Sequence, residues 1–79
     1  MPKPYYLLLS REPGDTVFFQ QFGDFDRETV EFERDDFRDH GYLAKDLRIV
    51  TAKSAKPADC DAAINLLNRI ASSPRKARS

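Results

Sequence analysis

The side chains best suited to chemistry lie close together in the middle of the chain. His40 is the only histidine, and Asp36 precedes it by one helical turn, with Asp35 and Asp39 beside it. A histidine and a carboxylate at this spacing can hold a metal ion, but a metal site needs three or four converging ligands. Because no second histidine and no cysteine cluster accompany them, we expect no metal site. His40 is instead expected to bond the last carbonyl groups of a helix.

The single cysteine does not indicate an enzyme. Cys60 lies on an apolar stripe and is typical of a small buried hydrophobe, and nothing in the sequence brings His40 beside it as a base. The sequence contains no glycine-rich phosphate loop, nucleophile elbow or paired-cysteine motif. We therefore expect a protein with no catalytic residue and no cofactor, and one cysteine allows no internal disulfide.

Carboxylates are concentrated in one segment of a chain whose formal net charge is zero. Residues 21–41 hold eight acids and three arginines, whereas residues 42–79 hold eight basic residues and three acids. Like charges one helical turn apart repel, and acids near a helix C-terminus oppose its dipole, so stability alone does not favour this pattern. One interpretation is a solvated face whose charge the arginines offset; the other is an acidic strip that docks on a basic groove in place of nucleic-acid phosphates. The candidate partner-binding residues are Asp24, Glu28, Glu31, Asp35 and Asp39.

Strands and helices alternate around this acidic segment. Tyr5–Ser10 is apolar on both faces, which predicts a central strand, and residues 16–22 form a second strand after a turn containing Pro13 and Gly14. A helix over residues 27–40 follows, with Asp26 as its N-cap and Gly41 as its terminator. A third strand over 47–51 and a second helix from Pro57, stopped by Ser72-Ser73-Pro74, complete the chain.

The helical periodicity of residues 27–40 predicts which side faces the core. Winding the segment at 100° per residue puts Phe25, Val30, Phe32 and Phe37 on the inner half, together with Thr29, Glu33, Asp36 and His40. The remaining charged residues fall on the outer half: Arg27, Glu28, Glu31, Arg34, Asp35, Arg38 and Asp39.

These elements predict an α+β fold of order β-β-α-β-α. The three strands are expected to form an antiparallel sheet of order 2-1-3, with both helices on one face. Residues 1–73 would form a single domain and residues 74–79 a basic tail. An uncovered second sheet face would expose aromatic side chains that could stack bases or contact a partner; the aromatics of this region are Tyr5, Tyr6, Phe18, Phe19, Phe22 and Phe25.

The stretch Phe22–Asn68, above all Phe22–Glu31 and the run Asp39-His40-Gly41-Tyr42, resembles a group of small phage and prophage proteins. In size and class the chain also resembles anti-CRISPR proteins directed at type I (Cascade) effector complexes, with type I-C as a candidate subtype. This resemblance implies a stoichiometric inhibitor that binds the effector complex and blocks target DNA. It implies no catalytic residues.

Three functions follow from these observations. The first is a phage-encoded inhibitor, acting in the host cytoplasm, that places its acidic helix in the basic groove of a protein partner and binds no nucleic acid itself. The second is a small nucleic-acid-binding accessory protein that uses Arg48, Lys53, Lys56 and the tail. The third is a structural or dimerisation module. Each of the three functions is compatible with a homodimer. The longest apolar run, Tyr5–Leu9, is far shorter than the ~20 residues of a membrane span, and no signal peptide is expected.

Overall fold

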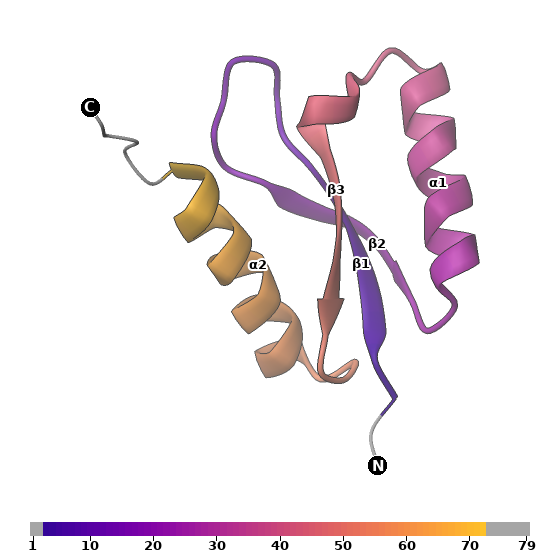
Figure 1. Ribbon diagram of the computed structural model, residues 1–79, viewed down its shortest axis with the longest axis vertical. Helices are drawn as coiled ribbons and strands as arrows, with labels where there is room; N and C mark the ends of the chain where they lie inside the picture. Colours follow the sequence, from indigo (N-terminus) through magenta and orange to yellow (C-terminus); the bar gives the residue numbers. More distant parts are fainter. Residues whose placement is uncertain (1–2, 73–79) are drawn as a thin grey trace.

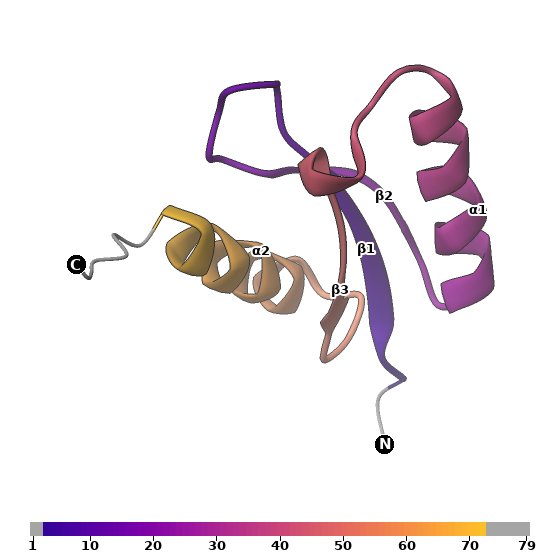
Figure 2. The same ribbon diagram turned by 45° about the horizontal axis from the view of Figure 1, so that its top comes forward.

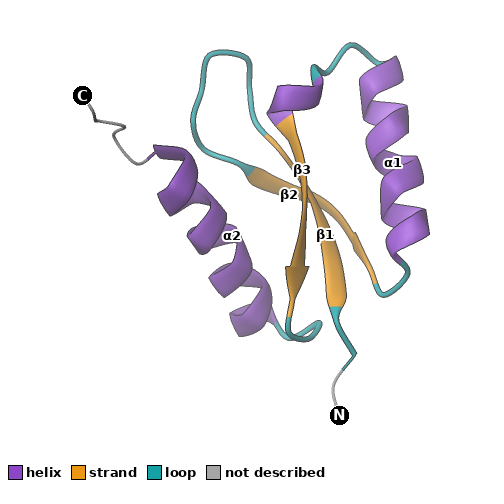
Figure 3. Cartoon of the chain, viewed as in Figure 1, coloured by secondary structure: helices purple, strands orange, loops and turns teal. Residues whose placement is uncertain are grey.

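The computed structural model describes residues 3–72 and contains three strands and two main helices (Figures 1 and 3). Their order is β-β-α-β-α, and the sheet is antiparallel with strand order β2-β1-β3, as predicted. A short 3-10 helix, η1, precedes the third strand. The bounds are β1 Tyr5–Ser10, β2 Phe19–Asp24, α1 Arg27–Asp39, η1 Ala44–Asp46, β3 Leu47–Ala52 and α2 Pro57–Ser72.

The apolar strand β1 is the centre of the sheet. Its three leucines, Leu7, Leu8 and Leu9, are completely buried. On one side β1 pairs with β3 without interruption from Tyr5 opposite Ala52 to Ser10 opposite Leu47. On the other side the register with β2 shifts between Leu8 and Leu9. Because β1 is apolar on both faces, both of its faces must be covered by other parts of the chain.

The two helices cover opposite faces of this sheet, so the expectation that both lie on one face is wrong. Side chains alternate along β1, and the core cluster that contains Leu7 and Leu9 also contains Cys60 of α2 and packs against Leu67. Leu8 points the other way, and α1 contacts both β1 and β2. Figures 1 and 2 show α1 and α2 on the two sides of the strands. The physical reason is that Leu8 is as apolar as its neighbours and needs its own cover.

This arrangement removes the uncovered aromatic face that a one-sided sheet would have had. Phe18 is buried and Tyr5, Tyr6 and Phe22 are half-buried, whereas Phe19 and Phe25 are about half exposed. Tyr5 packs edge-on against Phe25, with ring centroids 4.8 Å apart. Within residues 3–72 a helix lies on each side of the sheet, so a continuous base-stacking surface on the strands is not supported.

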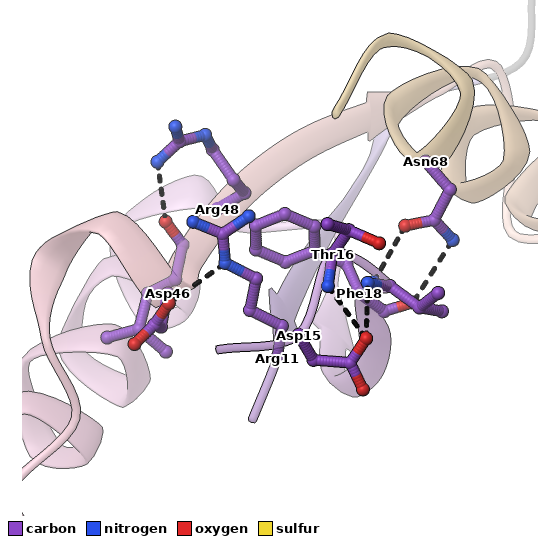
Figure 4. Close-up of polar contacts among 9 residues, drawn as sticks. Arg11, Asp15, Thr16, Phe18, Asp46, Arg48 and Asn68 are labelled. Atoms are coloured by element: carbon purple, nitrogen blue, oxygen red, sulfur yellow. Dashed lines mark hydrogen bonds and ion pairs between the residues drawn. The ribbon is translucent and has the colours of Figure 1, made fainter. Parts of the chain in front are cut away.

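The segment between β1 and β2 is longer than predicted, because β2 begins at Phe19 rather than at residue 16. Three contacts anchor this loop (Figure 4). The Asp15 carboxylate accepts the backbone N–H of Thr16 at 2.7 Å, and Arg11 Nε donates to Asp46 Oδ1 at 2.9 Å. Asn68 of α2 accepts the N–H of Phe18 at 2.7 Å and donates to its carbonyl at 3.2 Å. Asp15 and Asn68 thus supply hydrogen-bond partners for loop backbone groups that make no bond within the sheet.

Candidate functional site

Both ends of α1, the helix that carries the acidic segment, are fixed by the predicted residues. The Asp26 carboxylate caps the N-terminus, accepting the N–H of Glu28 at 3.3 Å and the hydroxyl of Thr29 at 2.8 Å. Gly41 ends the helix with a φ of +103°, a conformation that favours glycine. The Gly41 N–H donates to the carbonyl of Arg38 at 3.0 Å. The sequence therefore predicts the length of this helix closely.

The rotation of α1 differs from the predicted one. Val30 is completely buried and Phe37 is half-buried, as expected, but Phe25 and Phe32 are exposed. Asp36 and His40, also placed on the inner half, are exposed as well. The predicted face was centred on the phenylalanines, whereas only a narrow stripe around Val30 and Phe37 reaches the sheet. Burying these two apolar residues leaves Phe32 pointing away from the sheet.

The exposed side of α1 is a row of carboxylates around one phenylalanine. The Phe32 side chain is 67% exposed. Residues three and four positions away are its neighbours on a helix surface, and the same face continues one turn further. We call this surface the acidic face of α1; it consists of Glu28, Phe32, Asp35, Asp36 and Asp39, all exposed. It combines a concentrated negative charge with an apolar centre.

Two of the five predicted site residues, Glu31 and Asp24, are half-buried and lie outside the acidic face of α1. Glu31 is half-buried, and its carboxylate accepts a hydrogen bond from Arg27 Nε at 3.0 Å. Asp24, at the end of β2, is also half-buried and accepts the N–H of Asp26 at 2.8 Å, which fixes the turn into α1. Glu28, Asp35 and Asp39 are exposed, so they form the part of the predicted strip that a partner can reach, although the Asp35 carboxylate also accepts a hydrogen bond from Arg34 Nε at 3.2 Å.

Asp36 belongs to the acidic face although periodicity placed it inward. Its side chain is 64% exposed and lies one turn before His40, whose Nδ1 donates to the Asp36 carbonyl at 2.7 Å. That hydrogen bond, the Asp36 carboxylate and, more weakly, Asp39 raise the pKa of His40 above its ordinary value of 6.5. Protonated His40 would therefore offset part of the negative charge at this end of the helix.

No cluster in the described part of the chain suggests metal chemistry. Among residues 3–72, no three His, Cys, Asp or Glu side chains lie close enough together to hold a metal ion. Cys60 is buried, and its Sγ lies 3.7 Å from the carbonyl oxygen of Ser54. Burial, together with Asp61 and Asp59, raises the pKa of the Cys60 thiol, which disfavours the reactive thiolate. Cys60 is thus a core residue, as predicted.

The basic residues of the second hypothesis are not gathered into one patch. Arg48 is the second residue of β3 and Lys53 directly follows its end, about 16 Å away at the usual rise of a strand. Lys56 lies three residues beyond Lys53, and the tail lies outside the described residues. Arg48 contributes to the lining of a hollow next to Arg27, Arg34 and Arg38 of α1, but its guanidinium carbon lies 5.9 Å from the centroid of the Phe18 ring. Two of the α1 arginines do offset acids, as the first interpretation expects, because Arg27 pairs with Glu31 one turn away and Arg34 pairs with the adjacent Asp35 at 3.2 Å.

No helix among residues 3–72 is long and apolar enough to cross a membrane. Comparisons with protein-family models, with curated proteins and with solved structures find no match for this chain. Its function must therefore be argued from the acidic face, the arginine-lined hollow and the packing that positions them.

Proposed function

We propose that this protein is a non-catalytic inhibitor that binds the basic, nucleic-acid-binding groove of a protein partner through the acidic face of α1. The observation that carries the proposal is the 67% exposed Phe32 in a row of exposed carboxylates. Phe32 is the most exposed of the large apolar side chains among the described residues. A partner would bury it, because apolar anchors inside a charged surround are typical of binding hot spots.

The charge density of the acidic face suits a groove built for phosphates. From Glu28 to Asp39 the helix rises about 16 Å at 1.5 Å per residue. The four carboxylates on this length, of which Asp35 is paired with Arg34, lie about 4 Å apart on average, against about 3.4 Å between phosphates along one DNA strand. A groove that neutralises a nucleic-acid backbone would meet a similar line of charge on α1.

The energetics also favour a bound state over the free one. Asp35, Asp36 and Asp39 crowd the C-terminal end of α1, where the dipole disfavours each exposed anion by about 0.3–1 kcal/mol. Basic side chains of a partner would remove that repulsion. Burying the ring of Phe32 would add about 1.5–3 kcal/mol of hydrophobic stabilisation.

The partner class comes from the resemblance to anti-CRISPR proteins, which implies a type I Cascade complex in the host cytoplasm. The inhibitor would act by occupying the DNA groove with one copy per site. It would not bind DNA itself, because the acidic face repels phosphate.

The test is a competition experiment with purified type I-C Cascade and a labelled target duplex. The wild-type protein should block duplex binding. The charge-reversal pair Asp35→Lys/Asp39→Lys should inhibit at least tenfold less well. A matched control exists in Glu12→Lys/Asp61→Lys, which changes the net charge equally at two exposed positions outside α1, and it should inhibit like the wild type. Absence of inhibition, or equal loss in both variants, would contradict the proposal.

A second arm omits Cascade and mixes the protein with the duplex alone at physiological salt. We expect no complex at micromolar protein. A micromolar complex whose affinity falls steeply with salt would instead favour the nucleic-acid-binding function.

A further inference from the structure

The outer edge of β3 is a regular strand edge that no further strand of the described chain covers. β3 lies at one side of the three-stranded sheet, and its pairing with β1 runs over six residues without a shift in register. β2, at the other side, is interrupted by a register shift. Proteins usually blunt a long, regular edge with a proline or a bulge, because such an edge offers hydrogen bonds to another strand. β3 contains neither, so its outer edge is open to pairing.

The hydrogen-bond pattern shows which backbone groups of β3 point outward. The N–H of Arg11 donates to the carbonyl of Asp46 at 3.0 Å, in register with the β1–β3 pairs. Bonded and non-bonded pairs alternate along an antiparallel ladder, so every second residue after Asp46 also bonds β1. The backbone groups of the residues between them point away from the sheet: Leu47, Ile49 and Thr51.

Two of these three residues are left to pair with another strand. Leu47 is already used, since its N–H bonds a carbonyl of η1 and its own carbonyl accepts Arg48 Nη1 at 3.1 Å. Ile49 and Thr51 make no comparable bond within residues 3–72. A second copy of the strand can run antiparallel with its Val50 opposite Val50. Ile49 of each copy then faces Thr51 of the other, and each pair exchanges both backbone hydrogen bonds.

An apolar stripe of α2 lies along the same edge. Leu66 and Ile70 are 53% and 60% exposed, and Ala62 is exposed on the same side of the helix. Ala62 and Leu66 line a groove of about 230 Å³ together with Thr51 near the end of β3. We call Ala62, Leu66 and Ile70 the α2 stripe. It lies beside the open edge of β3, where a partner of that edge would cover it.

We propose that a second copy of this chain occupies this surface, so that β3 pairs with β3 and the α2 stripe with the α2 stripe about a two-fold axis. Antiparallel pairing of the strands also makes the two α2 helices antiparallel. The first turn of one α2, which carries Asp59, then lies towards the last turn of the other, which carries Arg69. Opposite charges thus meet at both ends of the stripe, which is the charge complementarity that self-pairing requires.

A second copy fits this surface better than a single strand of another protein does. An added strand would satisfy the backbone of β3 but leave the α2 stripe exposed, whereas a second copy covers the stripe with an identical one. The dimer joins the two sheets into one continuous sheet. The acidic face belongs to α1, on the opposite side of the sheet from α2, so dimerisation leaves it free and does not depend on the proposed function (Figure 2).

The test is sedimentation equilibrium of the full protein over a wide range of concentration. We expect a reversible approach to twice the monomer mass of 9.1 kDa as the concentration rises. Leu66→Lys places like charges across the two-fold axis and should weaken dimerisation at least tenfold. Phe19→Lys is the matched control, since Phe19 is also 53% exposed but lies on β2, at the opposite edge of the sheet, and it should dimerise like the wild type.

Two further measurements test the geometry of the dimer. Leu66 lies in the middle of the α2 stripe, so the axis brings it opposite its own copy. Leu66→Glu should therefore also be monomeric alone, whereas an equal mixture of Leu66→Lys and Leu66→Glu should form a mixed dimer. The amides of Ile49 and Thr51 should exchange hydrogen at least tenfold more slowly in the dimer than in Leu66→Lys. The Val50 amide, which bonds β1, should be equally protected in both.

Two results would overturn the proposal. One is a monomer at every concentration, which would leave the edge of β3 to a strand of another protein. The other is a dimer that Phe19→Lys weakens as much as Leu66→Lys does, or in which Ile49 and Thr51 exchange at the monomer rate, because the copies would then meet elsewhere. Circular dichroism of each variant checks that the fold is intact.

Discussion

At the scale of single residues, His40 reports the electrostatics of the acidic face. Its Nδ1 donates to the Asp36 carbonyl, and the Asp36 carboxylate lies 3.9 Å away. We predict that the pKa of His40, followed by its ring proton shifts, lies above 6.5, the ordinary value. Asp36→Asn should lower this pKa only in part, because the carbonyl hydrogen bond, the larger cause, is retained.

The raised pKa of His40 determines in which direction its contribution to folding stability changes with pH. His40 binds its proton more tightly in the folded chain, so its contribution to stability is fully present below pH 6.5 and is lost as the pH rises through the folded-state pKa. A titration midpoint at or below 6.5 in the wild-type protein would contradict this account.

Some residue roles follow from sequence alone because they depend on local geometry. Asp26 as the cap, Gly41 as the terminator and Cys60 on an apolar stripe are all confirmed. The exposure of Phe32 was not predictable in this way, because periodicity places an aromatic ring inward by default. The bonding of Glu31 to Arg27 depends on how α1 is rotated against the sheet, which only tertiary packing determines.

At the scale of elements, the Asn68 side chain links the long β1–β2 loop to α2. Asn68 bonds both the N–H and the carbonyl of Phe18, a residue that is 2% exposed (Figure 4). The guanidinium carbons of Arg11 and Arg48 lie 4.9 Å and 5.9 Å from the centroid of the Phe18 ring. These two hydrogen bonds of Asn68 therefore connect α2 to the loop residue that directly precedes β2. Sequence could not pair residues 18 and 68, since the contact is between one side chain and a distant backbone.

We predict that Asn68→Ala lowers the free energy of unfolding by about 1–3 kcal/mol, because it leaves buried backbone groups without a partner. Asn65→Ala, at an exposed position of the same helix, serves as the control and should change it by less than about 0.5 kcal/mol. The measurements are urea denaturation and hydrogen exchange of the Phe18 amide. Equal stability of the two variants, with unchanged exchange at Phe18, would show that the loop is held elsewhere.

At the scale of the whole molecule, the fold is one three-stranded sheet between two helices. Element order and strand order were predictable, since β1 alone is apolar enough to be central. The side on which each helix lies was also implied by the three successive leucines of β1, which need cover on both faces. The prediction missed this because it took the two apolar faces of this strand only as evidence for a central position, and not also as a need for cover on both faces.

The two halves of the core should unfold together. Leu7 packs towards α2 and Leu8 lies on the opposite face, and both are completely buried. Leu7→Ala and Leu8→Ala should each lower stability by about 2–5 kcal/mol, a large share of the total for a domain of this size. Urea titrations followed by circular dichroism and by tyrosine fluorescence should give coincident transitions. Loss of one helix alone, with the rest still folded, would contradict a single cooperative core.

The most direct test of the central claim is the rate at which the protein associates with purified type I-C Cascade at several salt concentrations. Opposite charges across an interface accelerate encounter, and salt screens this effect. The account predicts that association slows steeply with salt for the wild type and for Glu12→Lys/Asp61→Lys. Asp35→Lys/Asp39→Lys should associate at least tenfold more slowly at low salt, with little dependence on salt. Equal rates and equal salt dependence for both pairs would mean that the acidic face of α1 is only solvated surface.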